Sequence, residues 1–85
     1  MSNNKQNIHG ELKLALMLKR MQLKDFAMSL VRPNGTKGVS HTAVIRVAQN
    51  YESTPWLREA IQQLINDSKQ EFPDFWRSAN IAMIL

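Results

Sequence analysis

A short stretch near the middle of the chain, Gly38 to Ala48, does most to limit how this sequence can fold. Ser40 is a favourable helix N-cap, because its hydroxyl can accept a hydrogen bond from a free amide of the first turn. Gly38 can supply the positive φ that a tight turn often requires. The apolar residues that follow at i, i+1 and i+4 are Ala43, Val44 and Val47. This pattern predicts a turn and then a short helix with one buried side.

The opposite side of this predicted helix carries no acidic residue. Its outward residues are His41, Thr42, Ile45, Arg46 and Gln49. Arg can bridge a guanine edge and Gln an adenine edge, while Thr and Ile can contact the methyl group of thymine. We interpret this face as a surface that reads base pairs of double-stranded DNA. The plainer alternative is a helix face that only meets water.

Charge is distributed unevenly along the chain. The sequence of 85 residues has 11 Lys or Arg and 7 Asp or Glu, and its net charge is +4. Eight of these cations and two of the acids lie in residues 1–50. A basic front half fits a partner that is a polyanion, and chance variation in a small basic protein is the alternative explanation.

Apolar periodicity along the rest of the chain predicts an all-α fold of five helices. The expected helices span about residues 9–21, 22–30, 40–50, 55–66 and 74–85, and residues 67–71 form a polar segment. The first helix is apolar over a wide arc and has two neighbouring stripes. One stripe contains Leu14, Met17, Leu18 and Met21, and the other contains Ile8, Leu12, Ala15 and Leu16. The expected organisation is a disordered arm at 1–7, a DNA-binding domain at 8–67 and a C-terminal helix at 68–85.

A loop, Val31 to Lys37, separates the second predicted helix from the third. Pro33 suits the first central position of a turn, and Asn34 or Gly35 can adopt a positive φ. The segment predicts a surface loop, with a small hairpin through Asn34 and Gly35 as one possible form.

Other classes of function find little support in the composition. The chain has no Cys, which excludes disulfides and thiolate-bound metals. No triad, glycine-rich phosphate loop or metal-ligand spacing is present, so we expect neither catalysis nor a cofactor. No apolar run approaches ~18 residues and the first residues do not resemble a signal peptide. We therefore expect a cytoplasmic protein that does not enter membranes.

Ala27 in the second predicted helix is followed by Leu30 and, after the loop, by Gly38 with its aliphatic and cap residues. This order resembles the lambda-repressor-like helix-turn-helix of phage repressors and Cro proteins, over about residues 9–67. One departure is the seven-residue insertion, Val31 to Lys37, in the turn. A less specific similarity to Ner-type phage regulators rests on the spacing of Trp56, Ile61, Leu64, Pro73 and Trp76.

The resemblance implies a transcriptional regulator, a repressor of phage or autoregulatory type that occupies a promoter as a homodimer on an inverted-repeat operator. It implies base contacts by His41, Thr42, Ile45 and Arg46, to which the outward face adds Gln49. The expected phosphate contacts are Gln22, Lys24, Arg32, Lys37 and Ser40. The competing hypothesis is a protein-interaction module, such as part of an antitoxin or an assembly factor, that has this fold and does not bind specific DNA.

The C-terminal segment, residues 72–85, has apolar side chains on several sides of its predicted helix. One small domain cannot easily bury so much apolar surface. We expect part of it to pack Trp76 onto the fourth helix and the rest to meet a second copy of the chain. The expected dimer interface contains Phe75, Trp76, Ala79, Met83 and Ile84. The alternative is that residues 72–85 only cap the core of a monomer.

Overall fold

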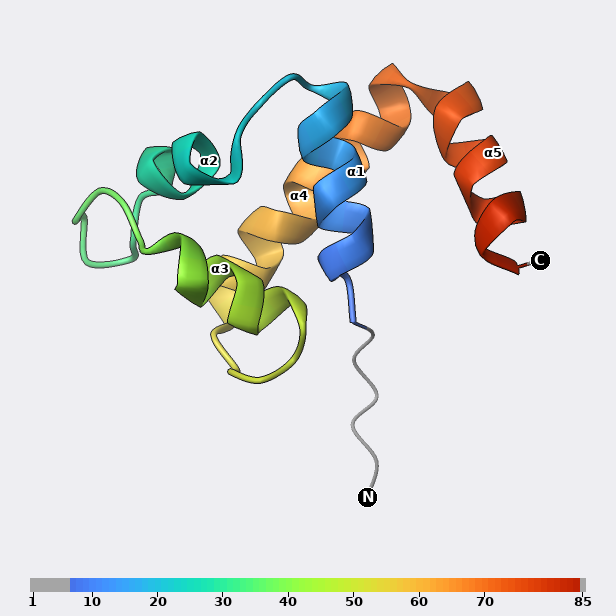
Figure 1. The fold of residues 1–85 in the computed structure, drawn as a ribbon. Coiled ribbons are helices and arrows are strands. Elements are labelled where there is room, and N and C mark those ends of the chain that lie inside the picture. Colours follow the sequence, from blue (N-terminus) through green and yellow to red (C-terminus); the bar gives the residue numbers. More distant parts are fainter. Residues whose placement is uncertain (1–6, 85) are drawn as a thin grey trace.

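The computed structural model describes residues 7–84, with side chains up to Ser78. Within this part of the chain there are five helices and no extended strand, so the predicted all-α class is confirmed. The arm expected at residues 1–7 lies, except for Asn7, outside the described residues. The helices are α1 (His9–Leu18), α2 (Leu23–Ser29), α3 (His41–Ala48), α4 (Pro55–Glu71) and α5 (Pro73–Ile84) (Figure 1).

The helix pair α1 and α4 forms the centre of the molecule. Helix α3 packs against both of them, α2 packs against α3, and α5 packs against α4. Figure 1 shows α2 and α3 on one side of the central pair and α5 on the other. The C-terminal helix is therefore separated in space from the α2–α3 pair that carries the predicted DNA-binding residues.

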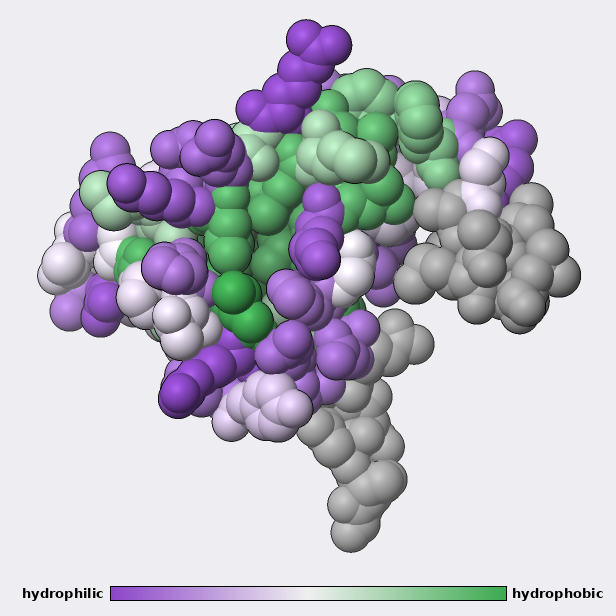
Figure 2. All heavy atoms as spheres, in the orientation of Figure 1, coloured by the Kyte–Doolittle hydropathy of each residue, from purple (hydrophilic) through white to green (hydrophobic). Residues whose placement is uncertain are grey.

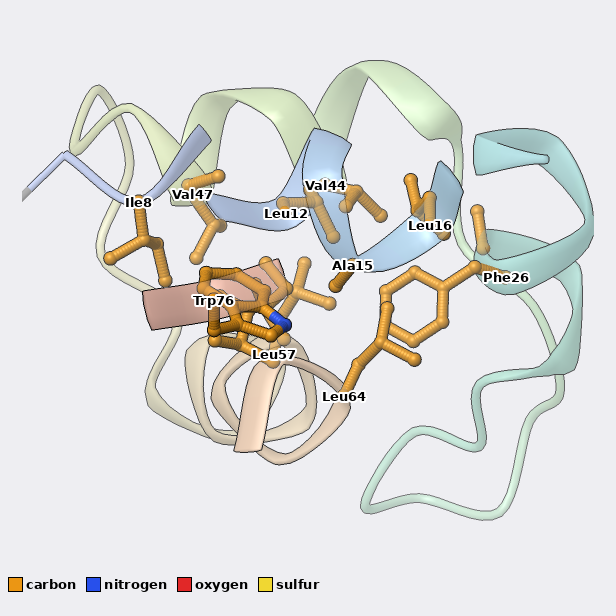
Figure 3. Close-up of a cluster of buried hydrophobic side chains, with 14 residues drawn as sticks. Ile8, Leu12, Ala15, Leu16, Phe26, Val44, Val47, Leu57, Leu64 and Trp76 are labelled. Carbon is orange, nitrogen blue, oxygen red and sulfur yellow. The ribbon is translucent and has the colours of Figure 1, made fainter. Parts of the chain in front are cut away.

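The hydrophobic core lies where α1, α3 and α4 meet. Figure 3 shows side chains from these helices pointing toward one another, with Phe26 of α2 and Trp76 of α5 adding one aromatic ring each. The side chains that are almost completely buried include those of Leu12, Val44, Val47, Leu57, Ile61 and Ile65. Burial of large aliphatic side chains stabilises each helix by far more than its intrinsic propensity does.

Helix α1 turns the second of its two predicted stripes into the core. The buried residues at this face are Ile8, Leu12, Ala15 and Leu16. The first stripe lies at the edge of the core, and its Met17 is 64% exposed. Both stripes have helical spacing, so apolar periodicity does not decide between them, and the choice depends on which face meets α3 and α4.

Helix α1 ends at Leu18, earlier than the predicted end at Met21. The Met21 N–H donates to the Leu16 carbonyl at 2.9 Å, and the Arg20 N–H donates to the Met17 carbonyl at 3.1 Å. These two bonds form a Schellman motif, which requires a left-handed residue just after the helix. That residue is Arg20, with φ of 55°. This helix end is not predicted from the sequence, because Gly or Asn normally occupies the left-handed position.

Arg20→Gly is expected to stabilise the protein. A side chain in the left-handed region costs about 1 kcal/mol, which glycine avoids. The free energy of unfolding in urea should rise by about that amount, and the melting temperature by roughly 4–8 °C. Lys13→Gly, at an exposed position inside α1, is the matched control and should destabilise by about 0.5–1 kcal/mol. A loss of stability in both variants would contradict this account of the helix end.

Helix α4 continues to Glu71, so the prediction that it ends near Asn66 is wrong. The segment 67–71 is polar, yet its Ser68 is fully buried and accepts a hydrogen bond from Trp76 Nε1 at 2.9 Å. Lys69 Nζ lies 5.2 Å from the centre of the Trp76 ring and 3.4 Å from Glu11 Oε2. The last turns of α4 are thus held by α1 and α5 through polar groups, which a search for apolar periodicity does not detect.

Candidate nucleic-acid interface

The N-terminus of α3 has the local structure that the sequence predicts. Ser40 has extended backbone angles, and its Oγ accepts a hydrogen bond from the Ala43 N–H at 3.1 Å. Gly38 has φ of +92°, as predicted for the turn. The Val39 N–H donates to the Ala27 carbonyl at 3.0 Å, which joins the start of α3 to α2. These contacts set the direction in which α3 leaves α2.

The outer face of α3 is available to a partner at three of the five predicted base-reading positions. His41, Thr42 and Arg46 are exposed, whereas Ile45 and Gln49 are partly buried. No acidic residue lies within α3. Figure 2 shows a mainly hydrophilic surface over the α3–α4 connection, and hydrophobic residues gathered higher on the same face, over α1.

Two of these five residues also interact with other parts of the chain. Gln49 Nε2 lies 3.1 Å from Nδ1 of His9, which is in α1. Arg46 Nη1 lies 3.2 Å from Glu52 Oε1, in the connection after α3. The outward pattern of α3 could not reveal either partner, because both lie outside the helix.

The C-terminus of α3 is a second Schellman motif. The Tyr51 N–H donates to the Arg46 carbonyl at 2.8 Å, and the Asn50 N–H donates to the Val47 carbonyl at 3.1 Å. Asn50 has φ of 66°, and its Oδ1 accepts a hydrogen bond from Arg58 Nη1 of α4 at 2.8 Å. The chain therefore folds back beside α3 and leaves Tyr51 78% exposed. The sequence pattern predicts only that Tyr51 lies between the third and fourth helices.

Residues 31–37 form the small hairpin that was one of the predicted forms of this loop. Val31 and Lys37 make an antiparallel bridge, and the Arg32 N–H donates to the Thr36 carbonyl at 2.8 Å. The Gly35 N–H donates to the Arg32 carbonyl at 2.8 Å, and Gly35 has φ of +91°. A turn followed by a left-handed glycine is a common way to close a three-residue hairpin loop.

The five predicted phosphate-binding residues are all exposed; they are Gln22, Lys24, Arg32, Lys37 and Ser40. A hollow of about 310 Å³ between α2 and the start of α3 brings Lys24, Ser40 and His41 together. Lys37 borders a separate hollow that also contains Asp25. Arg32 is held at the base of the hairpin, because its Nε–H donates to the Gly38 carbonyl at 3.1 Å.

The predicted dimer residues divide into three groups. Phe75 is 59% exposed and can contact a partner. Trp76 is 3% exposed and packs in the core of its own chain, as expected for its contact with α4, so it adds little to an outer surface. Ala79, Met83 and Ile84 lie outside the residues whose side chains the structure describes.

None of the helices in the described residues is long and apolar enough to cross a bilayer. Among those same residues, no group of three or more His, Asp or Glu could hold a metal ion. Comparisons with known proteins find no matching family model, no similar curated protein and no similar solved structure.

Proposed function

We propose that this chain is a sequence-specific DNA-binding transcriptional regulator that represses by occupying a promoter. The observation that carries the proposal is the outer face of α3, where His41, Thr42 and Arg46 are exposed and no residue of the helix itself is acidic. The exposed Lys24 of α2 and the hairpin cations Arg32 and Lys37 lie near the start of this helix. A small polar helix face bordered by cations suits a DNA groove bordered by phosphates. The lambda-repressor-like resemblance supports the same function, and we propose that the protein acts in the cytoplasm.

In the proposed complex, α3 enters the major groove. Arg46, His41 and Thr42 meet base edges, and the partly buried Ile45 contacts a thymine methyl group. Gln49 reads a base after its amide leaves His9. The phosphate contacts come from α2, the hairpin and the start of α3; the residues are Gln22, Lys24, Arg32, Lys37 and Ser40. These phosphate contacts fix the position of α3, and the base contacts select the sequence.

Affinity for duplex DNA is expected to fall steeply as salt is raised, because each neutralised phosphate adds ~0.9 to the slope of log affinity against log salt. Arg32→Ala with Lys37→Ala should weaken binding to specific and random duplexes about equally and lower this slope by up to ~2 units. The measurement is a titration of labelled duplexes at several salt concentrations. Lys13→Ala with Arg77→Ala removes the same charge from α1 and α5 and is the control.

A flat salt response by the unsubstituted chain would overturn the DNA-binding proposal and favour the protein-interaction module. An unchanged slope in the hairpin variant, with a steep slope in the unsubstituted chain, would limit the hairpin to a tolerated surface loop.

We also propose that the regulator binds as a homodimer through α5. A two-fold pair would place two copies of α3 in successive major grooves, ~34–36 Å apart, on an inverted repeat. The exposed Phe75 lies on the helix farthest from α2 and α3, so a contact there leaves the DNA-facing side open. An interface of ~800 Å² per partner is ordinary for such a dimer.

The full chain is expected to sediment as a dimer at tens of micromolar, and Phe75→Asp should shift it toward monomer. Met17→Asp places the same charge at another exposed apolar position, on α1, and should leave the mass unchanged. A chain ended after Glu71 is unsuitable for this test, because it lacks the core residue Trp76. A monomeric full chain with intact DNA binding would refute the dimer.

A further inference from the structure

The ion pair between Arg46 and Glu52 joins the main proposed base-reading side chain to an acid in the connection after α3. Arg46 Nη1 and Glu52 Oε1 lie 3.2 Å apart, and the two side chains are 58% and 42% exposed. A pair this exposed contributes little to stability. A carboxylate close to DNA also opposes DNA binding by charge repulsion. The position of Glu52 is therefore better explained by an effect on Arg46 than by stability or by affinity.

The backbone holds Glu52 beside Arg46. The Arg46 carbonyl accepts hydrogen bonds from the N–H groups of Tyr51 at 2.8 Å and Glu52 at 3.4 Å. The left-handed Asn50 makes this return of the chain possible, and Arg58 of α4 holds the Asn50 side chain. The backbone of Glu52 is therefore fixed relative to α3. Only the Glu52 side chain has to become ordered to reach the guanidinium of Arg46.

A guanidinium has five N–H donors in a rigid plane. Glu52 takes Nη1, so the edge formed by Nε and Nη2 is not occupied by this carboxylate. That edge can donate two parallel hydrogen bonds to O6 and N7 of a guanine. Holding one end of the plane lowers the entropy lost when the other end binds.

Resting on the proposed DNA-binding function, we propose that Glu52 is a positioning residue that sets the specificity of Arg46 for guanine. It orients the guanidinium for a bidentate base contact. Its negative charge also disfavours the alternative in which Arg46 turns toward a nearby phosphate. Glu52 thus raises discrimination between sequences while lowering affinity for random DNA.

The test uses the full chain and a duplex selected from a random pool for binding to the unsubstituted protein. A second duplex differs from it only in replacement of the guanine that Arg46 contacts. Glu52→Gln should reduce the ratio of the affinities for the two duplexes by about 3- to 10-fold. Its affinity for random duplex should rise. Glu59→Gln removes the same charge from an exposed position on α4 and should change affinity for both duplexes by equal factors. Melting temperatures should stay close to that of the unsubstituted chain.

The decisive comparison is made in the Arg46→Ala background, where Glu52→Gln should no longer alter the preference. The inference is overturned if Glu52→Gln weakens or strengthens both duplexes equally, or if its effect on preference persists without Arg46. Absence of any duplex binding by the unsubstituted chain would overturn the proposed function as well, so the two failures are distinguishable.

Discussion

Arg46→Ala is expected to weaken binding to the specific site by ~1–3 kcal/mol, and binding to random duplex by much less. The side chain is exposed on α3, whose own residues include no acid, and it pairs with Glu52 of the following connection. Removing it deletes a bidentate contact that only the correct base can offer. The measurement is a titration of both duplexes at one salt concentration, because affinities at different salt concentrations are not comparable.

Arg46→Lys is the matched control for charge. A lysine keeps the positive charge and so should keep affinity for random duplex, but its ammonium cannot reproduce the planar pair of donors. Its loss on the specific site should approach that of the alanine variant. If Arg46→Ala weakens both duplexes equally, Arg46 contacts only phosphate, and the base-reading role assigned to it is wrong.

Trp76→Ala is expected to lower the free energy of unfolding by ~3–5 kcal/mol. The indole is buried against the core, and its Nε1–H donates to the fully buried Ser68 Oγ. The substitution creates a large cavity and leaves that hydroxyl without its donor. The loss is a large part of the total stability of a domain this small, and urea unfolding followed by circular dichroism measures it.

Trp76→Phe separates the two contributions. It keeps a ring in the core but removes the donor to Ser68, so its loss should be intermediate. Adding Ser68→Ala to Trp76→Phe should recover part of that loss, because no buried hydroxyl then lacks the indole donor. A loss below ~1 kcal/mol in Trp76→Ala would contradict the packing of α5 on α4.

The best-predicted part of the molecule is the turn and α3. There the cap at Ser40, the positive φ at Gly38 and the apolar stripe are all local signals, and they agree with one another. The outward positions of His41, Thr42 and Arg46 follow from the same periodicity. The hairpin could be predicted for the same reason, because Pro33 and Gly35 each have a local preference for turn conformations.

The features that sequence reasoning missed depend on contacts between segments. The choice of face on α1, the length of α4 and the interactions of Arg46 and Gln49 are decided by residues elsewhere in the chain. The end of α1 is a different case, because the left-handed position just after the helix is occupied by Arg20, a residue type that disfavours this conformation. Local propensity alone therefore does not predict this helix end.

The hairpin at residues 31–37 projects from the junction of α2 and α3, and its two ends lie side by side. Its base is closed by the Gly38 N–H, which donates to the Leu30 carbonyl at 2.6 Å, and by the Val39 N–H, which donates to the Ala27 carbonyl. Both bonds join residues outside the loop. The entropic cost of closing a loop grows slowly with its length. Lengthening the hairpin at its tip, between Asn34 and Gly35, should therefore cost little stability, which makes the tip a suitable attachment point. A fluorophore or a cross-linker placed there would report on the side of the protein beside α3, and a grafted peptide would extend that side. The hydrogen bonds that join α2 to α3 would remain in place.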